Sequence, residues 1–553
     1  HPVLHPDTHT QHADHAVQAL GAPPLRAPDQ ADDAAGRIDA RGRAALARLG
    51  VTLRPPRSPG LEASSVLTGT RVGTLPRTRP EALAALADRA RAAQQRWETV
   101  SVRDRGRVLL AFHDLLWQER QALLDLVQWE CGKARAHAFE ELADTAMNAR
   151  YYAATAHRHL ARRRRRGAVP GLTRVTVGYQ PKGLVGVISP WNYPLTLAAS
   201  DALAALVAGN AVMLKPDSLT PLTALAVRSL LRRAGLPEGL LTVVLGPGAE
   251  LGTPLVKACD AVMFTGSSAT GATVAVQGAA RLVSVSAELG GKNPLIVRSD
   301  APLRRTVRGA LRACFSNSGQ LCVSIERVYV HEAVWDRFVP AFVSAARALR
   351  VGADMEWSTG MGPLISPAHL ERVHAHVEDA VARGATVLTG GHPLPGTHPT
   401  AYAPTVLTGV GPGMRAYREE TFGPVVALYP VADDDAALAA ANDSPYGLNA
   451  SVWTRDTAAG RALARRLRCG TVNVNEGYAA TWGSTDAPMG GMGASGLGRR
   501  HGPEGIRKYT EVQAVAVQHG LGLHAPPGVG ERAWAGALAT YLRGLRHLTC
   551  PLR

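Results

Sequence analysis

The feature that most constrains the fold is a regular alternation of short apolar segments and amphipathic segments between residues 183 and 287. Five apolar segments have the length and the flanking Gly and Pro residues of buried strands: 183–189, 211–215, 242–245, 261–264 and 282–287. Four segments between them have helical periodicity: 196–208, 221–234, 248–258 and 269–276. This alternation predicts an α/β fold with a doubly wound parallel sheet, which binds ligands at the carboxyl ends of its strands.

The rest of the chain surrounds this region. Amphipathic helices are expected at 79–99, 104–119, 122–131 and 134–160, and a second α/β series runs from Leu295 to about Asn475. Residues 1–60 are rich in His, Pro, Asp and Arg and show only a short helix-like stretch at 38–49, so we interpret them as a mobile tail. Five His residues in the first 15 could hold a metal ion, but their spacing fits no single helix face and no Cys accompanies them. We therefore predict no metal site.

Composition narrows the function classes. The chain has 553 residues, of which 46% are hydrophobic, and no stretch of 18 uncharged apolar residues that would predict a membrane-spanning helix. Six Cys residues without a CxxC pair exclude a disulfide scaffold, and residues 1–15 lack the charged and apolar regions of a secretory signal, so we expect a cytoplasmic protein. The net charge of +16 comes mainly from Arg, which is typical of GC-rich coding, although a basic chain could also bind nucleic acid or an anionic membrane.

Three predicted strand ends carry residues with useful chemistry. Gly266 and Ser267 open a helix after strand 261–264, where free amides could hold a phosphate, although strand–Gly–helix junctions are also common in structural roles. Lys215 ends the strand 211–214, where it could bind ribose hydroxyls or phosphate, or be an ordinary rim lysine. Glu288 leaves an apolar strand into a Gly-Gly turn, where burial would raise its pKa and suit it to general-base catalysis, unless it is a capping or paired carboxylate.

Two further residues are candidates for covalent chemistry. Cys322 follows the polar stretch NSGQL and precedes an apolar run, so it lies on a turn as a nucleophile would, whereas Cys259 and Cys314 fall within helical patterns. The turn Pro190-Trp191-Asn192-Tyr193-Pro194 would hold the amide of Asn192 in one orientation as an oxyanion donor. Each feature alone also has a purely structural interpretation.

Taken together and in order, these motifs resemble the NAD(P)-dependent aldehyde dehydrogenase superfamily. The resemblance spans about Ser65 to Val517 and rests on PWNYP, KP, FTGS, ELGGK, GQLC, EETFGPV, NVNEG and PMGGMGASGLGR. It implies a Rossmann-type cofactor domain, an α/β catalytic domain and a β-hairpin oligomerisation arm. The implied division is a cofactor domain at 61–165 and 181–289, a catalytic domain at 290–486, oligomerisation strands at 166–180 and 504–518, and a C-terminal tail at 519–553.

The resemblance also implies roles for single residues. Cys322 would be the nucleophile, Glu288 the base that activates the hydrolytic water, and Asn192 with the Cys322 amide the oxyanion hole. The reaction would pass through a cysteine thiohemiacetal and a thioester, and hydrolysis by Glu288 favours a free acid over a coenzyme A thioester. Lys215 and Glu420 would bind ribose hydroxyls, Phe422 the nicotinamide side, and Gly266 with Ser267 the pyrophosphate. The full set of expected cofactor-binding residues is Ser189, Pro190, Trp191, Lys215, Ser218, Gly248, Phe264, Gly266, Ser267, Leu289, Glu420 and Phe422.

Cofactor and substrate are less constrained. Many NAD-preferring members carry a Glu three residues after the cofactor lysine, and Ser218 stands there instead, so we expect NADP to be accepted, with NAD also possible. The stretch from the RRRRR run through PWNYP is most similar to the actinobacterial type of NADP-dependent succinate-semialdehyde dehydrogenase. The two places that hold substrate-carboxylate arginines in better-studied members carry Ser200 and Ser316, so a broad-range aliphatic or aromatic aldehyde dehydrogenase is the alternative.

The expected partners follow from the same features. The superfamily arm predicts a homodimer or homotetramer, and the basic run 162–166, which we expect to end a helix, has no interleaved aromatic residues, so no nucleic-acid partner is expected. The segment 531–548 places Trp534, Leu538, Leu542 and Leu545 on one helix face. Such a helix could pack on the enzyme or between subunits, or make peripheral contact with a membrane.

Overall fold

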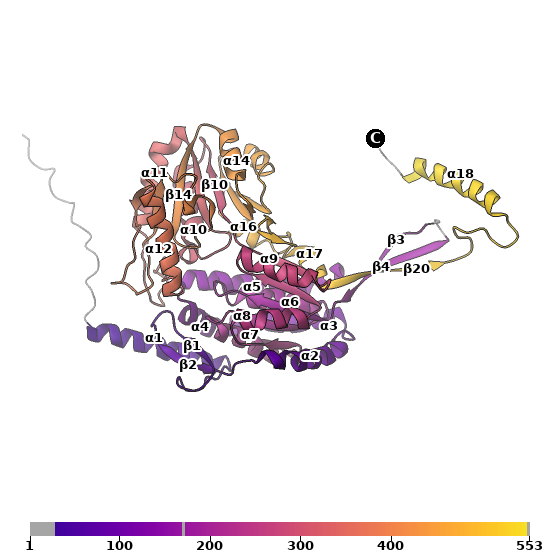
Figure 1. Ribbon diagram of the computed structural model, residues 1–553, viewed down its shortest axis with the longest axis horizontal. Helices are drawn as coiled ribbons and strands as arrows, with labels where there is room; N and C mark the ends of the chain where they lie inside the picture. Colours follow the sequence, from indigo (N-terminus) through magenta and orange to yellow (C-terminus); the bar gives the residue numbers. More distant parts are fainter. Residues whose placement is uncertain (1–27, 169–171, 550–553) are drawn as a thin grey trace, which may run out of the picture.

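Two parallel sheets and a projecting antiparallel arm organise the chain, as the computed structural model of residues 28–168 and 172–549 shows (Figure 1). The first sheet has the strand order β19-β9-β8-β5-β6-β7, and all neighbours are parallel except β19 and β9. Its strands are β5 (Leu184–Ser189), β6 (Ala211–Pro216), β7 (Leu241–Val243), β8 (Ala261–Thr265), β9 (Ser284–Glu288) and β19 (Gly496–Leu497).

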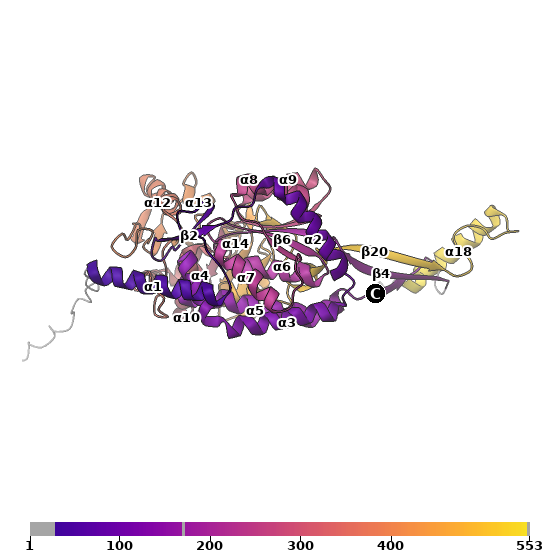
Figure 2. The same cartoon turned by 90° about the horizontal axis from the view of Figure 1, so that it is seen from below.

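Helices cover both faces of this sheet, which explains why β6 and β8 are buried at every position and read as continuous apolar runs. One face packs against α6 and α7, behind which α3, α4 and α5 form a second layer, and the other face packs against α2, α8 and α9 (Figure 2). The helices are α2 (Leu83–Trp97), α3 (Val102–Gln118), α4 (Arg120–Cys131), α5 (Arg135–His159), α6 (Thr196–Val207), α7 (Pro221–Arg233), α8 (Gly248–Ala258) and α9 (Ser268–Ala279).

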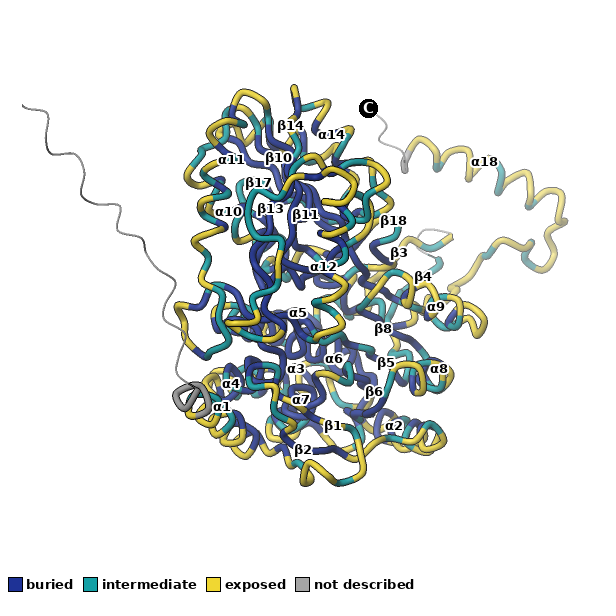
Figure 3. The backbone as a smooth tube through the Cα atoms, turned by 60° about the vertical axis from the view of Figure 1, so that its left-hand side comes forward, coloured by how far each residue is buried: buried dark blue, intermediate teal, exposed yellow. Residues whose placement is uncertain are grey.

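The second sheet has seven strands in the order β12-β13-β14-β11-β10-β16-β17, parallel except for the pair β12 and β13. The strands are β10 (Asn293–Val297), β11 (Ile325–His331), β12 (Thr386–Thr389), β13 (Thr405–Thr408), β14 (Val425–Val431), β16 (Asn449–Trp453) and β17 (Thr471–Val474). The accompanying helices are α10 (Leu303–Phe315), α11 (Glu332–Arg347), α12 (Pro367–Ala382), α13 (Arg415–Arg418), α14 (Asp434–Asn442), α15 (Thr457–Ala464) and α16 (Ala479–Trp482). Both sheets form the buried centre of the molecule in Figure 3.

The arm is a three-stranded antiparallel sheet that projects from the body and carries the C-terminal helix at its far end (Figures 1 and 2). It consists of β3 (Arg163–Arg166), β4 (Thr173–Pro181) and β20 (Thr510–Gln518), and the helix is α18 (Glu531–Thr549). The Arg run therefore forms an exposed strand and does not end a helix as the sequence indicated. Residues 502–507 form the short helix α17 (Gly502–Arg507), so only part of the predicted strand 504–518 is extended.

The N-terminal region differs from the predicted mobile tail. Helix α1 (Pro28–Arg48) packs against α4, and its Leu46 and the following Leu49 are buried. Gly42 lies against the ring of Trp129, whose Nε1 donates to Asp39 Oδ1 at 2.8 Å. The prediction of a mobile tail is therefore wrong for this helix. Gly42 leaves room for the ring of Trp129 and Asp39 accepts its hydrogen bond, and these contacts join segments that are far apart in the sequence. The five His residues at positions 1–15 lie outside the described residues.

The remaining elements are short. They are β1 (Leu61–Ser64) and β2 (Arg71–Leu75), which form an antiparallel pair, β15 (Tyr446–Gly447) and β18 (Met492–Gly493), which form another, and the 3-10 turns η1 (Pro80–Ala82) and η2 (Ser316–Gly319). The described residues contain no helix that is long and apolar enough to cross a membrane. Within the same residues, no three or more His, Cys, Asp or Glu side chains are grouped so as to hold a metal ion.

Candidate active site

The predicted site residues of the first sheet lie at the carboxyl ends of its strands. Ser189 ends β5, Lys215 is the penultimate residue of β6, Phe264 is the penultimate residue of β8, and Glu288 ends β9. Because these strands are parallel, their carboxyl ends meet at one edge of the sheet. The structure thus brings to one edge four residues that are separated by up to a hundred positions in the sequence.

The turn at residues 190–194 is fixed by a buried ion pair. Lys133 Nζ lies 2.6 Å from Glu141 Oε2 and donates to the backbone oxygen of Asn192 at 2.7 Å. Glu141 also accepts hydrogen bonds from the amides of Leu195 and Thr196, which have no partner within the helix because they lie at the start of α6. The side chain of Asn192 is therefore held at the entrance of α6, and its Nδ2 donates to the backbone oxygen of Gln320 at 3.0 Å.

The loop before Cys322 adopts a backbone that most residues avoid. Asn317 and Ser318 have φ values of 50° and 59°, in the left-handed region, and a side chain at Gly319 would overlap the backbone of Gly423. Asn293 Nδ2 donates to the backbone oxygen of Cys322 at 2.7 Å. The backbone of this loop is therefore constrained, and it carries Cys322 to the cavity that Asn192 also lines.

The segment 419–425 is held by a second buried ion pair. Lys292 Nζ lies 2.5 Å from Glu326 Oε2, and the Glu326 carboxylate accepts hydrogen bonds from the amides of Thr421 and Phe422. Phe422 itself has a φ of 57°, which is uncommon for a residue with a bulky side chain. The lysine of the ELGGK motif therefore orders the loop that carries Phe422 and does not point into the site.

One cavity of about 220 Å3 brings the predicted residues together. It is lined by ten of them, namely Pro190, Trp191, Asn192, Gly266, Ser267, Glu288, Leu289, Cys322, Glu420 and Phe422. The other five predicted residues, Ser189, Lys215, Ser218, Gly248 and Phe264, are not part of its lining. A Cβ atom at Gly248, the first residue of α8, would lie 4.0 Å from Cε of Lys215, so these two residues form a separate contact between β6 and α8.

Several residues of the cavity were missed by sequence reasoning: Leu197, Thr265, Gly290, His369 and Arg372. His369 Nε2 lies 2.7 Å from the backbone oxygen of Phe422, and its ring contacts Trp191 with centroids 5.4 Å apart. Arg372 donates to the backbone oxygen of Glu420 at 3.1 Å. Both lie on α12. A His and an Arg three residues apart on a helix are typical of a solvent-exposed face, so the sequence pattern did not indicate a role in the cavity.

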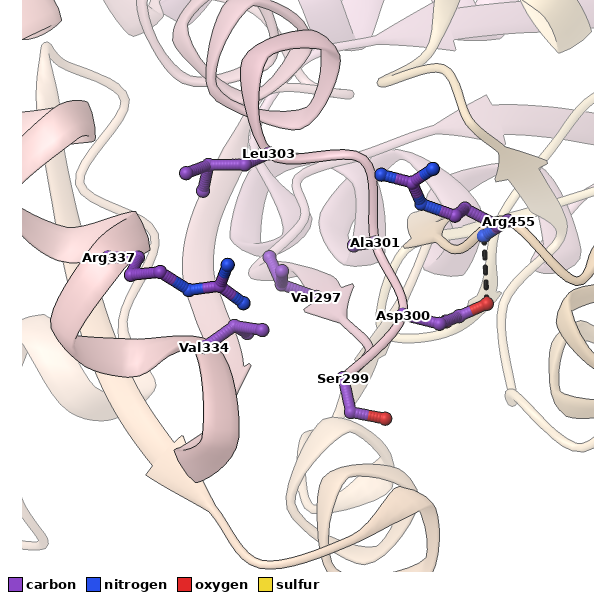
Figure 4. Close-up of a pocket in the computed structure, with 8 residues that line it drawn as sticks. All are labelled: Val297, Ser299, Asp300, Ala301, Leu303, Val334, Arg337 and Arg455. Carbon is purple, nitrogen blue, oxygen red and sulfur yellow. Dashed lines mark hydrogen bonds between the residues drawn. The ribbon is translucent and has the colours of Figure 1, made fainter.

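A second hollow, of about 190 Å3, lies at the carboxyl end of β10 and is shown in Figure 4. The guanidinium of Arg337 points toward Val297 there, and the Asp300 carboxylate accepts a hydrogen bond from the amide of Arg455 at 2.9 Å. No predicted catalytic or cofactor residue lines this hollow. The cavity at Cys322 is therefore the candidate active site.

Burial raises the pKa of both titratable candidates, Glu288 and Cys322. Glu288 is 2% exposed and its Oε1 has no hydrogen-bond partner among the described residues. Burial raises the pKa of Glu288 to about 7, and Arg500 acts in the opposite direction. Burial also raises the pKa of the Cys322 thiol to about 12. A carboxyl group with a pKa near neutral is suited to accept a proton from water.

A buried arginine faces this pair of groups. Arg500 Nη2 lies 2.7 Å from Asp201 Oδ2, and it also donates to Thr265 Oγ1 at 3.0 Å. Its charge acts on both Glu288 and Cys322. Burial lowers the pKa of the neighbouring Lys508 to about 8. Arg500 follows the PMGGMGASGLGR motif by one residue, and no local pattern indicates that it lies near Glu288.

The residues expected to hold a nicotinamide cofactor fit that group. The hydroxyl oxygens of Ser189 and Ser218 are buried without a hydrogen-bond partner in the described part of the chain, and burial lowers the pKa of Lys215. A Cβ at Gly266 would lie 2.7 Å from the Phe264 ring, and Ser267 caps α9 by accepting from the amide of Thr270. Unpaired hydroxyls, a lysine and a helix N-terminus at one sheet edge are suited to ribose and phosphate groups.

An apolar wall stands on another side of Cys322. Cys322 packs against a buried cluster of Tyr193, Leu197, Leu321, Val323, Leu448, Tyr478, Trp482 and Met489. Ser200 Oγ lies 2.9 Å from Thr196 Oγ1, and Ser316 Oγ donates to the backbone oxygen of Arg312 at 2.8 Å. The two serines that stand in place of carboxylate-binding arginines are thus satisfied within the protein.

Comparison with known proteins agrees with this architecture. The Aldehyde dehydrogenase family matches residues 56–515. A protein of Mycobacterium tuberculosis named "Putative succinate-semialdehyde dehydrogenase [NADP(+)] 2" is 51% identical over 499 residues, which is 90% of this chain and 95% of that protein. A similarly named protein of Mycolicibacterium smegmatis is 50% identical over 87% of this chain and 93% of its own length.

Solved structures show the same fold. Betaine aldehyde dehydrogenase from Staphylococcus aureus in complex with NAD+ has a TM-score of 0.80 at 29% identity and covers 85% of this chain and 94% of its own. An NADP-dependent enzyme of E. coli has a TM-score of 0.80 at 32% identity, with 85% and 97% covered. These matches confirm the predicted α/β fold class, and the chain belongs to the aldehyde dehydrogenase family.

Proposed function

We propose that this protein oxidises an aldehyde to the carboxylic acid with Cys322 as nucleophile. The observation that carries the proposal is that Cys322, Asn192 and Glu288 line one cavity. The Cys322 thiol would release its proton to water as its sulfur adds to the aldehyde carbon. The second N–H of the Asn192 amide, together with the Cys322 backbone N–H, would stabilise the resulting oxyanion. Asn192 is suited to this role because its other contacts fix its orientation.

Glu288 would act in the second half of the reaction. Its unpaired Oε1 would take a proton from water, and the hydroxide would attack the thioester carbon and release the acid and the thiolate. The nicotinamide cofactor, when bound, would accept the hydride from the aldehyde carbon. Lys215, Ser218, Glu420, Ser267 and Phe422 would position it, as the superfamily resemblance implies.

We propose NADP as the preferred cofactor, with NAD also accepted. Ser218 places a neutral hydroxyl where a carboxylate would repel a 2′-phosphate, and that hydroxyl has no partner in the described residues. The names of the relatives at 50–51% identity specify NADP.

The proposed substrate is succinate semialdehyde, which the names of these relatives support at 50–51% identity. A neutral aliphatic or aromatic aldehyde is the second candidate, because the wall beside Cys322 is aromatic and apolar and Ser200 and Ser316 carry no charge. Values of kcat/KM for succinate semialdehyde, hexanal and benzaldehyde, each with NADP and NAD, decide between them. A preference for hexanal or benzaldehyde would overturn the proposed substrate.

The nucleophile is tested by Cys322→Ala, for which we expect no NADPH formation with aldehyde. Cys469→Ala is the matched control, because Cys469 is a partly exposed free cysteine that does not line the cavity. An undiminished rate in Cys322→Ala would refute the assignment.

The projecting arm supports a homodimer or homotetramer as the proposed assembly. Its strand β20 exposes Val512, Val515 and Val517, and an apolar edge of this kind is suited to pair with another subunit. We propose that α18, at the end of the arm, contacts the protein itself or another subunit, and peripheral membrane contact is the alternative. A cytoplasmic location is proposed because the five described cysteines are all free.

A further inference from the structure

Two neighbouring cavities lie beside β7, the edge strand of the first sheet, where β2, α2 and α7 approach one another at the lower side of Figure 1. Their volumes are about 580 Å3 and about 510 Å3, within the size range of small-molecule sites. Arg228 and Arg232 of α7 line both cavities, so the two form one cleft. The cleft shares no lining residue with the cavity at Cys322.

The cleft is strongly cationic. Its walls carry six arginines against one carboxylate, Glu238, and the arginines are Arg77, Arg89, Arg96, Arg228, Arg232 and Arg233. Three of them have ion-pair partners: Arg77 pairs with Glu250, Arg232 with Glu238 at 3.4 Å, and Arg233 with Glu119 at 2.7 Å. In the ranges that the structure describes, Arg89, Arg96 and Arg228 have no ion pair.

Arg228 is the most informative of the three. It is partly buried at the junction of the two cavities, and its side chain makes no hydrogen bond to any described residue. Burial lowers the pKa of Arg228, and the neighbouring Arg232 lowers it further. A half-buried guanidinium next to a second cation is unfavourable unless an anion joins them, and this distinguishes Arg228 from the solvated arginines of an Arg-rich surface.

The floor of the cleft is apolar. Leu225, Val243 and Leu245 line the larger cavity beneath the arginines. A planar guanidinium binds phosphate or carboxylate oxygens through two parallel hydrogen bonds, and the apolar floor favours a ligand with a ring or aliphatic part. We propose that this cleft binds a small molecule that carries a phosphate group next to an apolar part, with Arg228 and Arg232 holding the phosphate.

The cleft is connected to the cofactor edge of the sheet. Arg77 pairs with Glu250 in the first turn of α8, and this helix begins at Gly248 beside Lys215. Thr78 bonds to Leu245 through both its amide and its hydroxyl, at 2.8 Å and 3.0 Å. A phosphate that drew Arg77 away from Glu250 would alter the start of α8, so we expect occupancy to change the KM for NADP more than kcat. This second readout rests on the proposed function, whereas binding itself does not.

Isothermal titration calorimetry of the full chain with phenyl phosphate tests the proposal. We expect binding that weakens as NaCl is raised, and a loss of affinity of about tenfold or more in the double variant Arg228→Gln/Arg232→Gln. Arg308→Gln is the matched control, because Arg308 is an exposed arginine of α10 in the other sheet's domain. Its affinity should equal that of the unmodified protein.

Three results would overturn the proposal. They are the absence of any binding of phenyl phosphate, equal affinity in the double variant, and loss of binding in Lys215→Ala. The last result would place the probe at the cofactor edge and not in the cleft. Arg228 bonds to no other described residue, and Arg232 makes only an exposed ion pair with Glu238, so the double variant should fold. An unchanged far-UV circular dichroism spectrum and urea midpoint verify this.

Discussion

Glu288→Gln separates the proposed catalytic role of Glu288 from the effect of burying its charge. The side chain is 2% exposed, its Oε1 has no hydrogen-bond partner among the described residues, and burial raises its pKa from 4.5 to about 7. Glutamine has nearly the same shape and is neutral, like the protonated acid. The substitution should therefore remove the general base without removing an internal contact of that oxygen.

The effect on stability depends on pH in a defined direction. Below pH 4.5 the carboxyl is protonated in both the folded and the unfolded protein, so it contributes no difference. As pH rises toward 7 the unfolded protein releases the proton and the folded protein retains it, which disfavours folding by about 1.4 kcal/mol per pH unit. Above the folded pKa this unfavourable contribution of Glu288 reaches about 3 kcal/mol.

Glu288→Gln should remove this contribution. We expect the free energy of unfolding to rise by up to about 3 kcal/mol at pH 8 and by less than about 1 kcal/mol at pH 5. Urea denaturation at both pH values measures it, with Cys322→Ala as the control, because a thiol with a raised pKa is neutral at both. A gain that is equal at pH 5 and pH 8, or a loss of stability at pH 8, would refute the argument.

The same variant reports on the reaction. General-base catalysis contributes roughly 10²–10⁴-fold, so steady-state NADPH formation should fall by that factor. The first turnover should remain, because thiol addition and NADPH formation precede the hydrolysis of the thioester, in which Glu288 would act. Rapid mixing should therefore show a burst of about one NADPH for each subunit, and a variant without a burst would contradict the assigned step.

Three further outcomes are expected. Ser218→Glu should lower kcat/KM for NADP by roughly tenfold or more and leave that for NAD nearly unchanged, because a carboxylate repels the 2′-phosphate; initial rates with both cofactors measure it. Asp201→Asn should lower the free energy of unfolding by about 3–5 kcal/mol at pH 7, because Arg500 loses its buried partner; urea denaturation measures it. Deletion of residues 525–553 should leave turnover unchanged, because α18 lies at the far end of the arm. If vesicle flotation recovers the full chain no better than the truncated chain, membrane contact is excluded.

Local patterns were sufficient for the five parallel strands of the first sheet. The predicted strand 261–264 corresponds to β8 (Ala261–Thr265) and the predicted helix 221–234 to α7 (Pro221–Arg233), because buried parallel strands and amphipathic helices have distinct periodicities. The strand ends then placed Lys215 and Glu288 at one edge without knowledge of any contact. The aldehyde dehydrogenase motifs added Cys322 and Asn192, which periodicity alone left open.

Contacts between distant segments could not be predicted in this way. Helix α1 packs against Trp129, and a local reading of the sequence cannot pair this tryptophan with Gly42 or Asp39. His369 and Arg372 reach the cavity only because α12 packs beside the loop of Phe422. Arg500 has no local pattern that distinguishes it from the many other arginines of the chain.

Three buried ion pairs hold the loops of the candidate site from outside the cavity. Lys133–Glu141 holds the turn of Asn192, Lys292–Glu326 holds the loop of Phe422, and Arg500–Asp201 faces Glu288. Buried ion pairs add little net stability, but loss of one partner leaves an uncompensated charge. The candidate site residues are therefore kept in place by charged side chains that line no part of the cavity. In contrast, Arg228 beside β7 has no such partner within the described residues, and this is why the proposed ligand is placed at Arg228 and its neighbour Arg232.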